Sequence, residues 1–376
     1  MNPLGSVSRT VFTVRHGSGP PLSAVGFSAP DAIGPVTEAT VPRCGPNPFD
    51  NVSKAASVVS ARERISPNMA SDSMPKRQLR RVVVTGAAGF IGCHLIERLV
   101  RDHASVVVGL DNERSGSWAR LGVPCERIER DLAELSSDEF ADICQGADAV
   151  FHLAAEKYNS SRSTPAKVID VNIDATQRLF DAAARVDVGK VVFTSSLYAY
   201  GGLGPEPMSE RDVPTPTTVY GMSKIAGEQL LRVAQRDHGF RRWSVARLFF
   251  VYGPRQYAEG GYKSVIVSNF ERLARGEAPT VYGDGNQALD YVYIDDVVDA
   301  LIRMVDERAD GVTVNVSTGR ALSINDLTQR MLAVSSSPLA PIFCPPDWTA
   351  GTVRVGDPAL AEAQLGWRAA TPMDDG

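Results

Sequence analysis

The sequence lacks the patterns that define disulfide-rich, metal-binding and nucleic-acid-binding proteins. Its five cysteines are an odd number without C-x-x-C spacing, so we expect reduced thiols and neither a disulfide framework nor a zinc site. Its five histidines form no H-E-x-x-H or similar pair, and no metal site is predicted. The net charge is −5 and Lys and Arg are not clustered, which argues against nucleic acid as a partner because phosphates require a local surplus of positive charge.

Membrane-spanning and export signals are also lacking. No apolar run reaches the roughly 18–20 residues that a membrane helix needs, and the N-terminus has no continuous apolar segment of the kind found in secretory signals. We therefore expect no membrane partner and a cytoplasmic location.

Residues 1–78 differ in composition from the rest of the chain. They are rich in Gly, Pro, Ser, Ala and Val, and prolines interrupt any sustained period, so we expect a disordered N-terminal extension. A transit peptide fits poorly because acidic residues such as Asp31 and Glu38 occur here. A start codon placed too far upstream is favoured, since Met69 and Met74 both precede the first predicted strand.

From Arg81 onward, strand-like and helix-like segments alternate. Short β-branched runs are separated by longer segments with helical spacing. This alternation predicts βαβ units and hence an α/β fold, a doubly wound parallel sheet covered by helices on both faces. The main segments are "RVVVTG" (81–86), "HLIERLVRD" (94–102), "SVVVGLDN" (105–112), "ADAVFHLAA" (147–155), "VIDVNIDATQRLFDAAARV" (168–186), "KVVFTSS" (190–196) and "WSVARLFFVYG" (243–253).

A glycine triplet follows the first predicted strand. Gly86, Gly89 and Gly92 in "VTGAAGFIGCHL" lie on a strand-to-helix turn, where the missing side chains let the backbone approach a pyrophosphate at the helix N-terminus. Three glycines alone could serve only the turn. However, Asp111 ends the next strand about 20 residues on, where a carboxylate accepts hydrogen bonds from an adenosine ribose and repels a 2′-phosphate. The pattern predicts NAD, in preference to NADP.

Two further residues bear on this cofactor prediction. Arg114, close to Asp111, would weaken the preference for NAD over NADP. Asp131 in "ERDLAE" follows a third strand and is either part of the adenine pocket or a solvated surface residue.

The stretch "TPTTVYGMSKIAGEQLLR" (215–232) brings a phenol and an ammonium together at the start of a helix. Tyr220 and Lys224 are four residues apart and so share one helix face. An ammonium and a positive nicotinamide ring both favour the ionised phenol, so we expect a lowered pKa for Tyr220 and a role as general base and acid. An isolated Y-x-x-x-K would mean little, but this one follows five strand-like runs. Ser196, at the end of "FTSS", is the predicted third member, while Ser195 could simply terminate the strand.

Together these motifs resemble the extended short-chain dehydrogenase/reductase family, particularly its nucleotide-sugar epimerase and dehydratase branch, which is UDP-glucose 4-epimerase-like. The resemblance covers residues 80–376, and "HLAA" at 152–155, "DVNIDAT" around Asn172, "RLFFVYGPRQ" and "VYGDGNQALDYVYIDDVVDAL" contribute to it. It implies a Rossmann-like NAD-binding domain over 79–250, to which 291–316 return. It also implies a smaller C-terminal α/β substrate-binding domain made of 251–290 and 317–376.

The resemblance also implies the site residues. Catalytic roles fall on Ser196, Tyr220 and Lys224. Substrate contacts fall on Ser196, Tyr198, Phe250, Arg255, Tyr282 and Arg354. Contacts to NAD fall on Gly86, Ala88, Gly89, Phe90, Ile91, Gly92, Asp111, Asn112, Asp131, Leu132, Leu153, Ala154, Ala155, Asn172, Tyr220 and Lys224.

Departures from the family's patterns narrow the reaction. The 4,6-dehydratases carry an Asp-Glu pair where this chain has Leu197 and Tyr198, and the sugar-acid decarboxylases usually have a Glu that aligns with Tyr198. An NAD-dependent 4-epimerase of a UDP-linked sugar therefore leads. Against it, Phe250 replaces an Asn that approaches the substrate, and Leu289 replaces an Arg that commonly contacts the diphosphate; Arg255, Lys263 and Arg354 are candidate substitutes.

Two alternatives stay open. One is an NAD(P)-dependent reductase or dehydrogenase of another sugar or alcohol, and the other is a catalytically silent NAD-binding scaffold. The resemblance further implies a homodimer through the helices around 168–186 and 220–237. Their apolar positions Val168, Val171, Leu179 and Leu230 would serve a dimer or packing against the sheet equally well.

Overall fold

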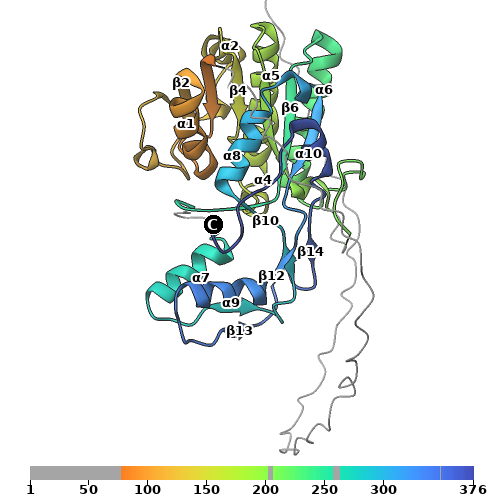
Figure 1. The fold of residues 1–376 in the computed structure, drawn as a ribbon. Helices are drawn as coiled ribbons and strands as arrows, with labels where there is room; N and C mark the ends of the chain where they lie inside the picture. Colours follow the sequence, from red (N-terminus) through yellow and green to blue (C-terminus); the bar gives the residue numbers. More distant parts are fainter. Residues whose placement is uncertain (1–77, 202–205, 257–262, 348) are drawn as a thin grey trace, which may run out of the picture. The chain divides into compact units, whose positions relative to one another are not determined.

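The computed structural model describes residues 78–201, 206–256, 263–347 and 349–376 (Figure 1). The predicted disordered extension therefore lies outside the described residues, apart from residue 78. No helix in the described part of the chain is long and apolar enough to cross a membrane.

A seven-stranded parallel sheet forms the centre of the fold, in the order β11-β6-β5-β4-β1-β2-β3. The order reverses between β1 and β4, as in doubly wound sheets, so the predicted fold class is confirmed. The strands are β1 (Leu79–Thr85), β2 (Ala104–Asp111), β3 (Glu126–Glu129), β4 (Ala149–His152), β5 (Val191–Ser196), β6 (Trp243–Leu248) and β11 (Val312–Val316).

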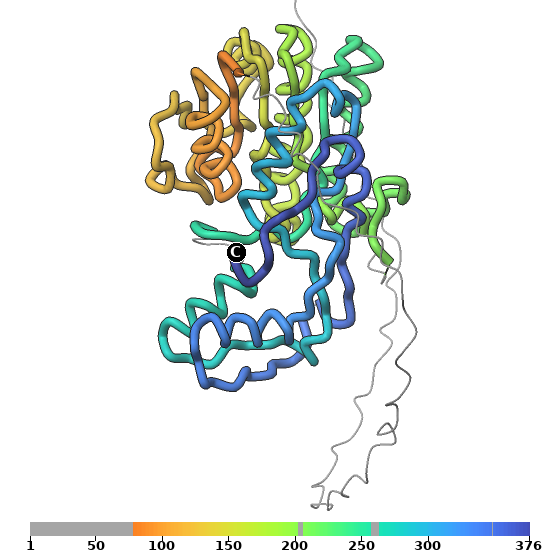
Figure 2. Tube along the Cα trace, in the orientation of Figure 1, coloured from red at the N-terminus to blue at the C-terminus, as the bar shows by residue number. Residues whose placement is uncertain are grey.

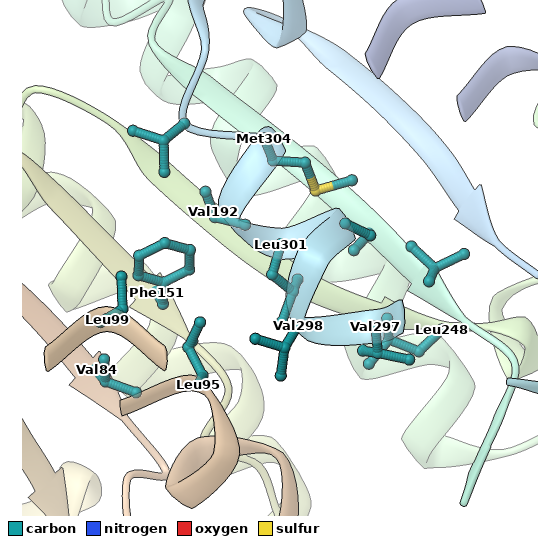
Figure 3. Close-up of a cluster of buried hydrophobic side chains, with 14 of the residues drawn as sticks. Val84, Leu95, Leu99, Phe151, Val192, Leu248, Val297, Val298, Leu301 and Met304 are labelled. Carbon is teal, nitrogen blue, oxygen red and sulfur yellow. The ribbon is translucent and has the colours of Figure 1, made fainter. Parts of the chain in front are cut away.

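Helices cover both faces of this sheet, and each face has its own hydrophobic cluster. Leu95 and Leu99 of α1 (Phe90–Asp102) pack with Val297 and Leu301 of α8 (Ile294–Arg303) on one face, where Figure 3 also shows Phe151 of β4 between them and the sheet. On the other face the helices are α2 (Ser137–Cys144), α5 (Thr176–Arg185) and α6 (Val219–His238), which contribute Phe140, Leu179 and Leu231 among others. Segments 294–303 and 312–316 thus belong to the large sheet and its cover.

The smaller part of the molecule is built from short strands and two helices (Figure 1). Its sheets are β10-β7, β12-β9-β14 and β13-β8, and Leu289, Tyr291 and Leu327 belong to its hydrophobic cluster. The elements are β7 (Phe250–Tyr252), α7 (Val265–Ala274), β8 (Thr280–Tyr282), β9 (Ala288–Leu289), β10 (Tyr291–Tyr293), β12 (Leu322–Ser323), α9 (Ile324–Val334), β13 (Ile342–Cys344) and β14 (Val353–Arg354).

The helix α10 (Ala359–Leu365) differs from the expected division of the chain, which assigned all of 317–376 to the substrate-binding part. Ala361, Leu365 and Trp367 belong to the hydrophobic cluster of the large sheet, and the Trp367 indole donates a hydrogen bond to the Asp296 carbonyl at 3.0 Å. The tube in Figure 2 shows the chain then turning back from α10 toward α7. Burial of a tryptophan against the large sheet explains the return.

The segment predicted as one helix over 168–186 is interrupted. It comprises α4 (Pro165–Ile169), a π-helical turn η3 (Asp170–Ala175) that contains Asn172, and α5. Such turns are frequent at functional sites. The remaining short helices are α3 (Ser160–Ser163), η1 (Trp118–Arg120), η2 (Leu132–Glu134), η4 (Leu197–Ala199) and η5 (Glu307–Ala309).

Candidate active site

A cleft of about 740 Å³ opens at the carboxyl ends of the parallel strands. Ligands of doubly wound sheets bind at this edge, where loops leave neighbouring strands. The predicted residues among its lining are Gly86, Gly89, Phe90, Ile91, Gly92, Asp111, Asn112, Asp131, Leu132, Leu153, Ala154, Ala155, Ser196, Tyr198, Tyr220 and Lys224.

The glycine turn between β1 and α1 leaves no room for side chains. Gly86 has a φ of +71°, and a Cβ on it would lie 2.7 Å from the Ala154 nitrogen. A Cβ on Gly92 would lie 2.2 Å from the Gly86 carbonyl oxygen. The helix begins after Gly89, which provides no side-chain cap, so its first N–H groups face the cleft end where a phosphate would be bound.

Asp111 lies next to this turn, at the end of β2. Its side chain is buried, and its two carboxylate oxygens accept hydrogen bonds from the Ala88 nitrogen at 3.0 Å and the Glu113 nitrogen at 2.8 Å. Burial raises the pKa of Asp111, and these two hydrogen bonds oppose the shift. The carboxylate is thus held in a fixed orientation at the position expected for a ribose contact.

Arg114 and Glu156 join two loops at the mouth of the cleft. The Arg114 guanidinium donates to a Glu156 oxygen at 2.7 Å and lies 3.5 Å from the carboxylate of Asp131, which also accepts from the Asn112 amide at 2.9 Å. Glu156 was missed in the sequence, although it directly follows the "HLAA" segment. Arg114, which was expected to weaken the preference for NAD over NADP, is therefore paired with a carboxylate of this chain.

The predicted catalytic residues come together at the ends of β5 and α6. The helix is capped by Thr218, whose hydroxyl accepts from the Gly221 nitrogen at 3.0 Å, and Tyr220 follows within its first turn. Ser196 lies near enough to Tyr220 for its side chain to favour the ionised phenol. Lys224 Nζ lies 5.7 Å from the centre of the Tyr220 ring and donates to the Thr194 carbonyl at 2.9 Å.

Burial dominates the electrostatics of this pair. It lowers the pKa of Lys224 to about 8, with the nearby Glu228 carboxylate opposing the shift. Burial raises the pKa of Tyr220 to about 12, and the Ser196 side chain opposes that shift. The expected lowering of the Tyr220 pKa is therefore not produced by the residues of this chain, because desolvation of the phenolate exceeds their stabilisation.

Asn172 holds the loop after β4 in place and does not itself line the cleft. Its side chain accepts from the Glu156 nitrogen at 2.7 Å and donates to the Glu156 carbonyl at 3.1 Å and to Ser223 at 3.0 Å. This fixes residues 153–156 relative to α6. The π-helical turn brings the amide into this position.

Two further tyrosine rings, those of Tyr158 and Tyr198, pack beside Tyr220. Tyr198 stacks on Tyr158 with ring centres 4.7 Å apart and meets Tyr220 edge-on at 6.0 Å. The buried Arg354 guanidinium lies 5.6 Å from the centre of the Tyr198 ring and donates to its hydroxyl at 3.4 Å. Tyr158 was not predicted, since "EKYNSS" carries no motif by which sequence reasoning could find it.

Four of the predicted substrate residues do not lie in the lining of this cleft, and Arg354, which lies behind Tyr198, is one of them. Phe250 packs on Tyr291, with ring centres 5.9 Å apart. Arg255 is held by Glu97 of α1 through bonds of 2.6 and 2.9 Å. Tyr282 is 47% exposed on β8 of the smaller part. Phe250 and Arg255 thus take a packing or pairing partner outside the cleft.

Comparison with known proteins identifies the family. The sequence model of the NAD dependent epimerase/dehydratase family matches residues 82–317, more than half of the chain. The chain belongs to this family. The family is NAD-dependent, and the glycine turn and Asp111 fit that cofactor: a phosphate would lie against the uncapped helix N-terminus and the ribose against the carboxylate.

Relatives of this family cover most of the described chain. A UDP-glucose 4-epimerase of Mycolicibacterium smegmatis is 33% identical over 79% of this chain and 96% of the relative. A UDP-glucuronic acid decarboxylase of Arabidopsis thaliana is 31% identical over 79% of this chain and 86% of the relative. The crystal structure of Thermotoga maritima UDP-glucose 4-epimerase with UDP-glucose, 30% identical, aligns with a TM-score of 0.73 over 79% of this chain and 96% of that chain.

Proposed function

We propose that the protein is an NAD-dependent 4-epimerase of a UDP-linked hexose. The observation that carries the proposal is the meeting of Ser196, Tyr220 and Lys224 in one cleft with the glycine turn. Similarity to a UDP-glucose 4-epimerase over nearly all of that relative supports the nucleotide-sugar class. The sugar itself is open.

The residues of the chain would act as follows. The Tyr220 phenol accepts the proton of the C4 hydroxyl and later returns it, while Ser196 donates a hydrogen bond to the same oxygen. NAD, when bound, would supply the reversible hydride transfer at C4. Lys224 contributes a positive charge beside the phenol, which compensates part of the cost of burying its ionised form.

Decarboxylases and dehydratases of the same family need an additional acid or base beside the sugar. Among the described residues of the cleft the acidic side chains are Asp111, Asp131 and Glu156. The first two lie on the cofactor side, and Glu156 is paired with Arg114. Position 198 carries a tyrosine whose ring packs on Tyr158. These features favour epimerisation over the decarboxylation carried out by the plant relatives.

Leu289 supports a second candidate, a reductase or dehydrogenase of another sugar or alcohol. Its side chain is buried in the cluster of the smaller part and offers no charge to a diphosphate. In such an enzyme the same three residues would act, but NAD would be exchanged in each cycle. A catalytically silent scaffold is disfavoured because Ser196, Tyr220 and Lys224 all line the same cleft.

We also propose a homodimer through α4 and α6, with the cytoplasm as its location. The residues first considered for this interface, Val168, Val171 and Leu179, are buried within the chain. Met222 and Val233 are 56% and 41% exposed on one face of α6, and Ile169 is 48% exposed on α4. Met222→Glu should give a monomer by light scattering, whereas the control Val334→Glu, on exposed α9, should leave the mass unchanged. An unchanged dimer in Met222→Glu would contradict this interface.

The reaction is tested by incubating the protein with UDP-glucose, UDP-N-acetylglucosamine and UDP-glucuronate, with and without added NAD, and reading the products by NMR. The proposal expects a 4-epimer of one sugar without accumulation of NADH. Stoichiometric NADH would favour the dehydrogenase, and release of carbon dioxide from UDP-glucuronate would favour a decarboxylase.

A further inference from the structure

A buried charged cluster lies directly behind the catalytic pair. Glu228 and Arg247 are almost fully buried and form a two-pronged ion pair, with distances of 2.9 Å to Arg247 Nε and 2.7 Å to Arg247 Nη2. Ser195 donates to the same Glu228 carboxylate at 2.6 Å. A single carboxylate thus binds to β5, to β6 and, through its own backbone, to α6.

This cluster continues the contacts that hold the catalytic residues. Tyr220, Lys224 and Glu228 follow at four-residue spacing on one face of α6. They face three consecutive residues at the end of β5: Lys224 donates to the Thr194 carbonyl, Glu228 accepts from Ser195, and Tyr220 lies near Ser196. The helix is therefore held in register against the strand by Glu228 one turn beyond Lys224.

We propose that Glu228 is a positioning residue of the active site, which fixes α6 against the end of β5 and places a negative charge one helical turn from Lys224. The inference rests on the proposed function for its kinetic test. Arg247 completes the cluster, because its charge is balanced by Glu228 and its guanidinium lies 4.6 Å from the centre of the Tyr200 ring. Ser195 binds the Glu228 carboxylate and precedes Ser196, so this hydrogen bond fixes the end of β5 relative to α6.

Among the described groups that face the Lys224 ammonium, Glu228 is the one that carries a negative charge. Facing the ammonium are Tyr220 and Glu228 on α6, the Thr194 carbonyl and the Phe193 ring on β5, and His152 on β4. Burial lowers the pKa of His152 to about 3, so this imidazole is neutral. The carboxylate of Glu228 opposes the desolvation that lowers the pKa of Lys224. Arg247 lies behind the carboxylate.

The test compares Glu228→Gln and Ser195→Ala with two matched variants. Asp310→Asn breaks the ion pair of the buried Lys190, which precedes β5 at the opposite end of the strand. Ser244→Ala removes a buried hydroxyl that donates to the Met304 and Ala309 carbonyls at 3.1 and 2.8 Å. These controls lose comparable buried interactions away from the cleft.

For Glu228→Gln we expect kcat to fall about tenfold or more at neutral pH with KM within about twofold, because α6 is no longer held in register against the end of β5. The basic limb of the kcat profile should move about one pH unit lower. Ser195→Ala keeps the ion pair and should lower kcat about threefold. If Glu228→Gln fails to fold, the kcat of Ser195→Ala compared with the controls tests the positioning role. Changes in kcat and in the basic limb no larger than those of the controls would overturn the proposal.

A second readout does not depend on the substrate. The ionisation of Tyr220 in the NAD complex can be followed by ultraviolet absorbance as the difference between the wild type and Tyr220→Phe. Glu228→Gln should require a higher pH for this ionisation than the wild type. An unchanged titration would overturn the proposal even if the protein converts none of the UDP-sugars, whereas a shifted titration without turnover would contradict only the proposed reaction.

Discussion

Lys224 lies beside Tyr220 with its Nζ 5.7 Å from the ring centre, and its hydrogen bond goes to the Thr194 carbonyl at 2.9 Å. The lysine is thus fixed to the strand that carries Ser196, the residue whose side chain lies near the tyrosine hydroxyl. Both Tyr220, the acid–base group, and Lys224, its charged neighbour, therefore project from α6 toward the end of β5. The arrangement leaves the phenol protonated at neutral pH until additional positive charge is present beside it.

Replacement of Tyr220 by Phe should remove turnover and retain the fold. The hydroxyl is the group that exchanges the proton, so we expect kcat to fall by about 10²–10⁴-fold. Thermal unfolding and the affinity for NAD, measured by calorimetry, should change little because the ring keeps its contacts with Tyr198. Residual activity within about twofold of the wild type would assign the proton transfer to another group.

The activity should fall as the pH rises above about 8. The pKa of Lys224 is lowered to about 8 by burial, so the side chain is an ammonium below that pH and neutral above it. Loss of the charge removes the compensation of the Tyr220 phenolate. A kcat profile measured from pH 6 to 10 should show this limb, and Lys224→Arg should lack it because a guanidinium stays protonated. A limb of unchanged position in Lys224→Arg would contradict the assignment to Lys224.

His152 should make stability fall in mild acid. It is fully buried between Thr85 and Thr176, with distances of 2.7 and 2.9 Å, and burial lowers its pKa from 6.5 to about 3. As the pH falls below about 6.5, His152 therefore binds a proton in the unfolded state before it does so in the folded state. The stabilising contribution, complete above that pH, is lost between about 6.5 and 3.

The expected loss from this histidine is about 2 kcal/mol between pH 6.5 and 5. Urea unfolding at both values checks it, and His152→Asn should lose correspondingly less stability over this interval. The exposed His238 provides the control, since His238→Asn should keep the acid loss of the wild type. An equal loss in His152→Asn and the wild type would be incompatible with a neutral buried imidazole.

Glu156→Gln should raise the affinity for NADP relative to NAD. In the wild type Arg114 is paired with Glu156 at 2.7 Å and lies 3.5 Å from Asp131, and the substitution would leave it only the longer pair, so that its guanidinium could turn to a 2′-phosphate more readily. We expect a shift of about tenfold in the ratio of the two dissociation constants, measured by calorimetry. Asp138→Asn, which breaks the exposed pair with Arg185, is the control. An unchanged ratio would show that Asp111 alone sets the preference.

The sequence predicted the elements whose chemistry is local. The glycine turn, Asp111 and the triad were found because each depends on residue types at short spacing, and the structure brings them to one cleft. The interrupted helix was missed because Asn172 takes its partners, Glu156 and Ser223, from distant parts of the chain. The pairing of Arg114 with Glu156 is likewise long-range.

The surroundings of the predicted substrate residues were not readable from the sequence for the same reason. Arg255 looked available in the sequence, but Glu97 of α1 holds it. The pKa of Tyr220 was expected to fall because Y-x-x-x-K spacing places an ammonium beside the phenol. The spacing does not reveal that the hydroxyl is desolvated, which raises its pKa. Burial and pairing depend on the packed structure.

The most direct test of the central claim, transient oxidation at C4 with retained cofactor, uses a UDP-sugar deuterated at C4. The account predicts that the 4-epimer carries the deuterium at C4 after turnover in ordinary water, because the hydrogen leaves and returns within one cleft. NMR of the product measures this. Loss of the deuterium to solvent, or its appearance in free reduced cofactor, would contradict the account.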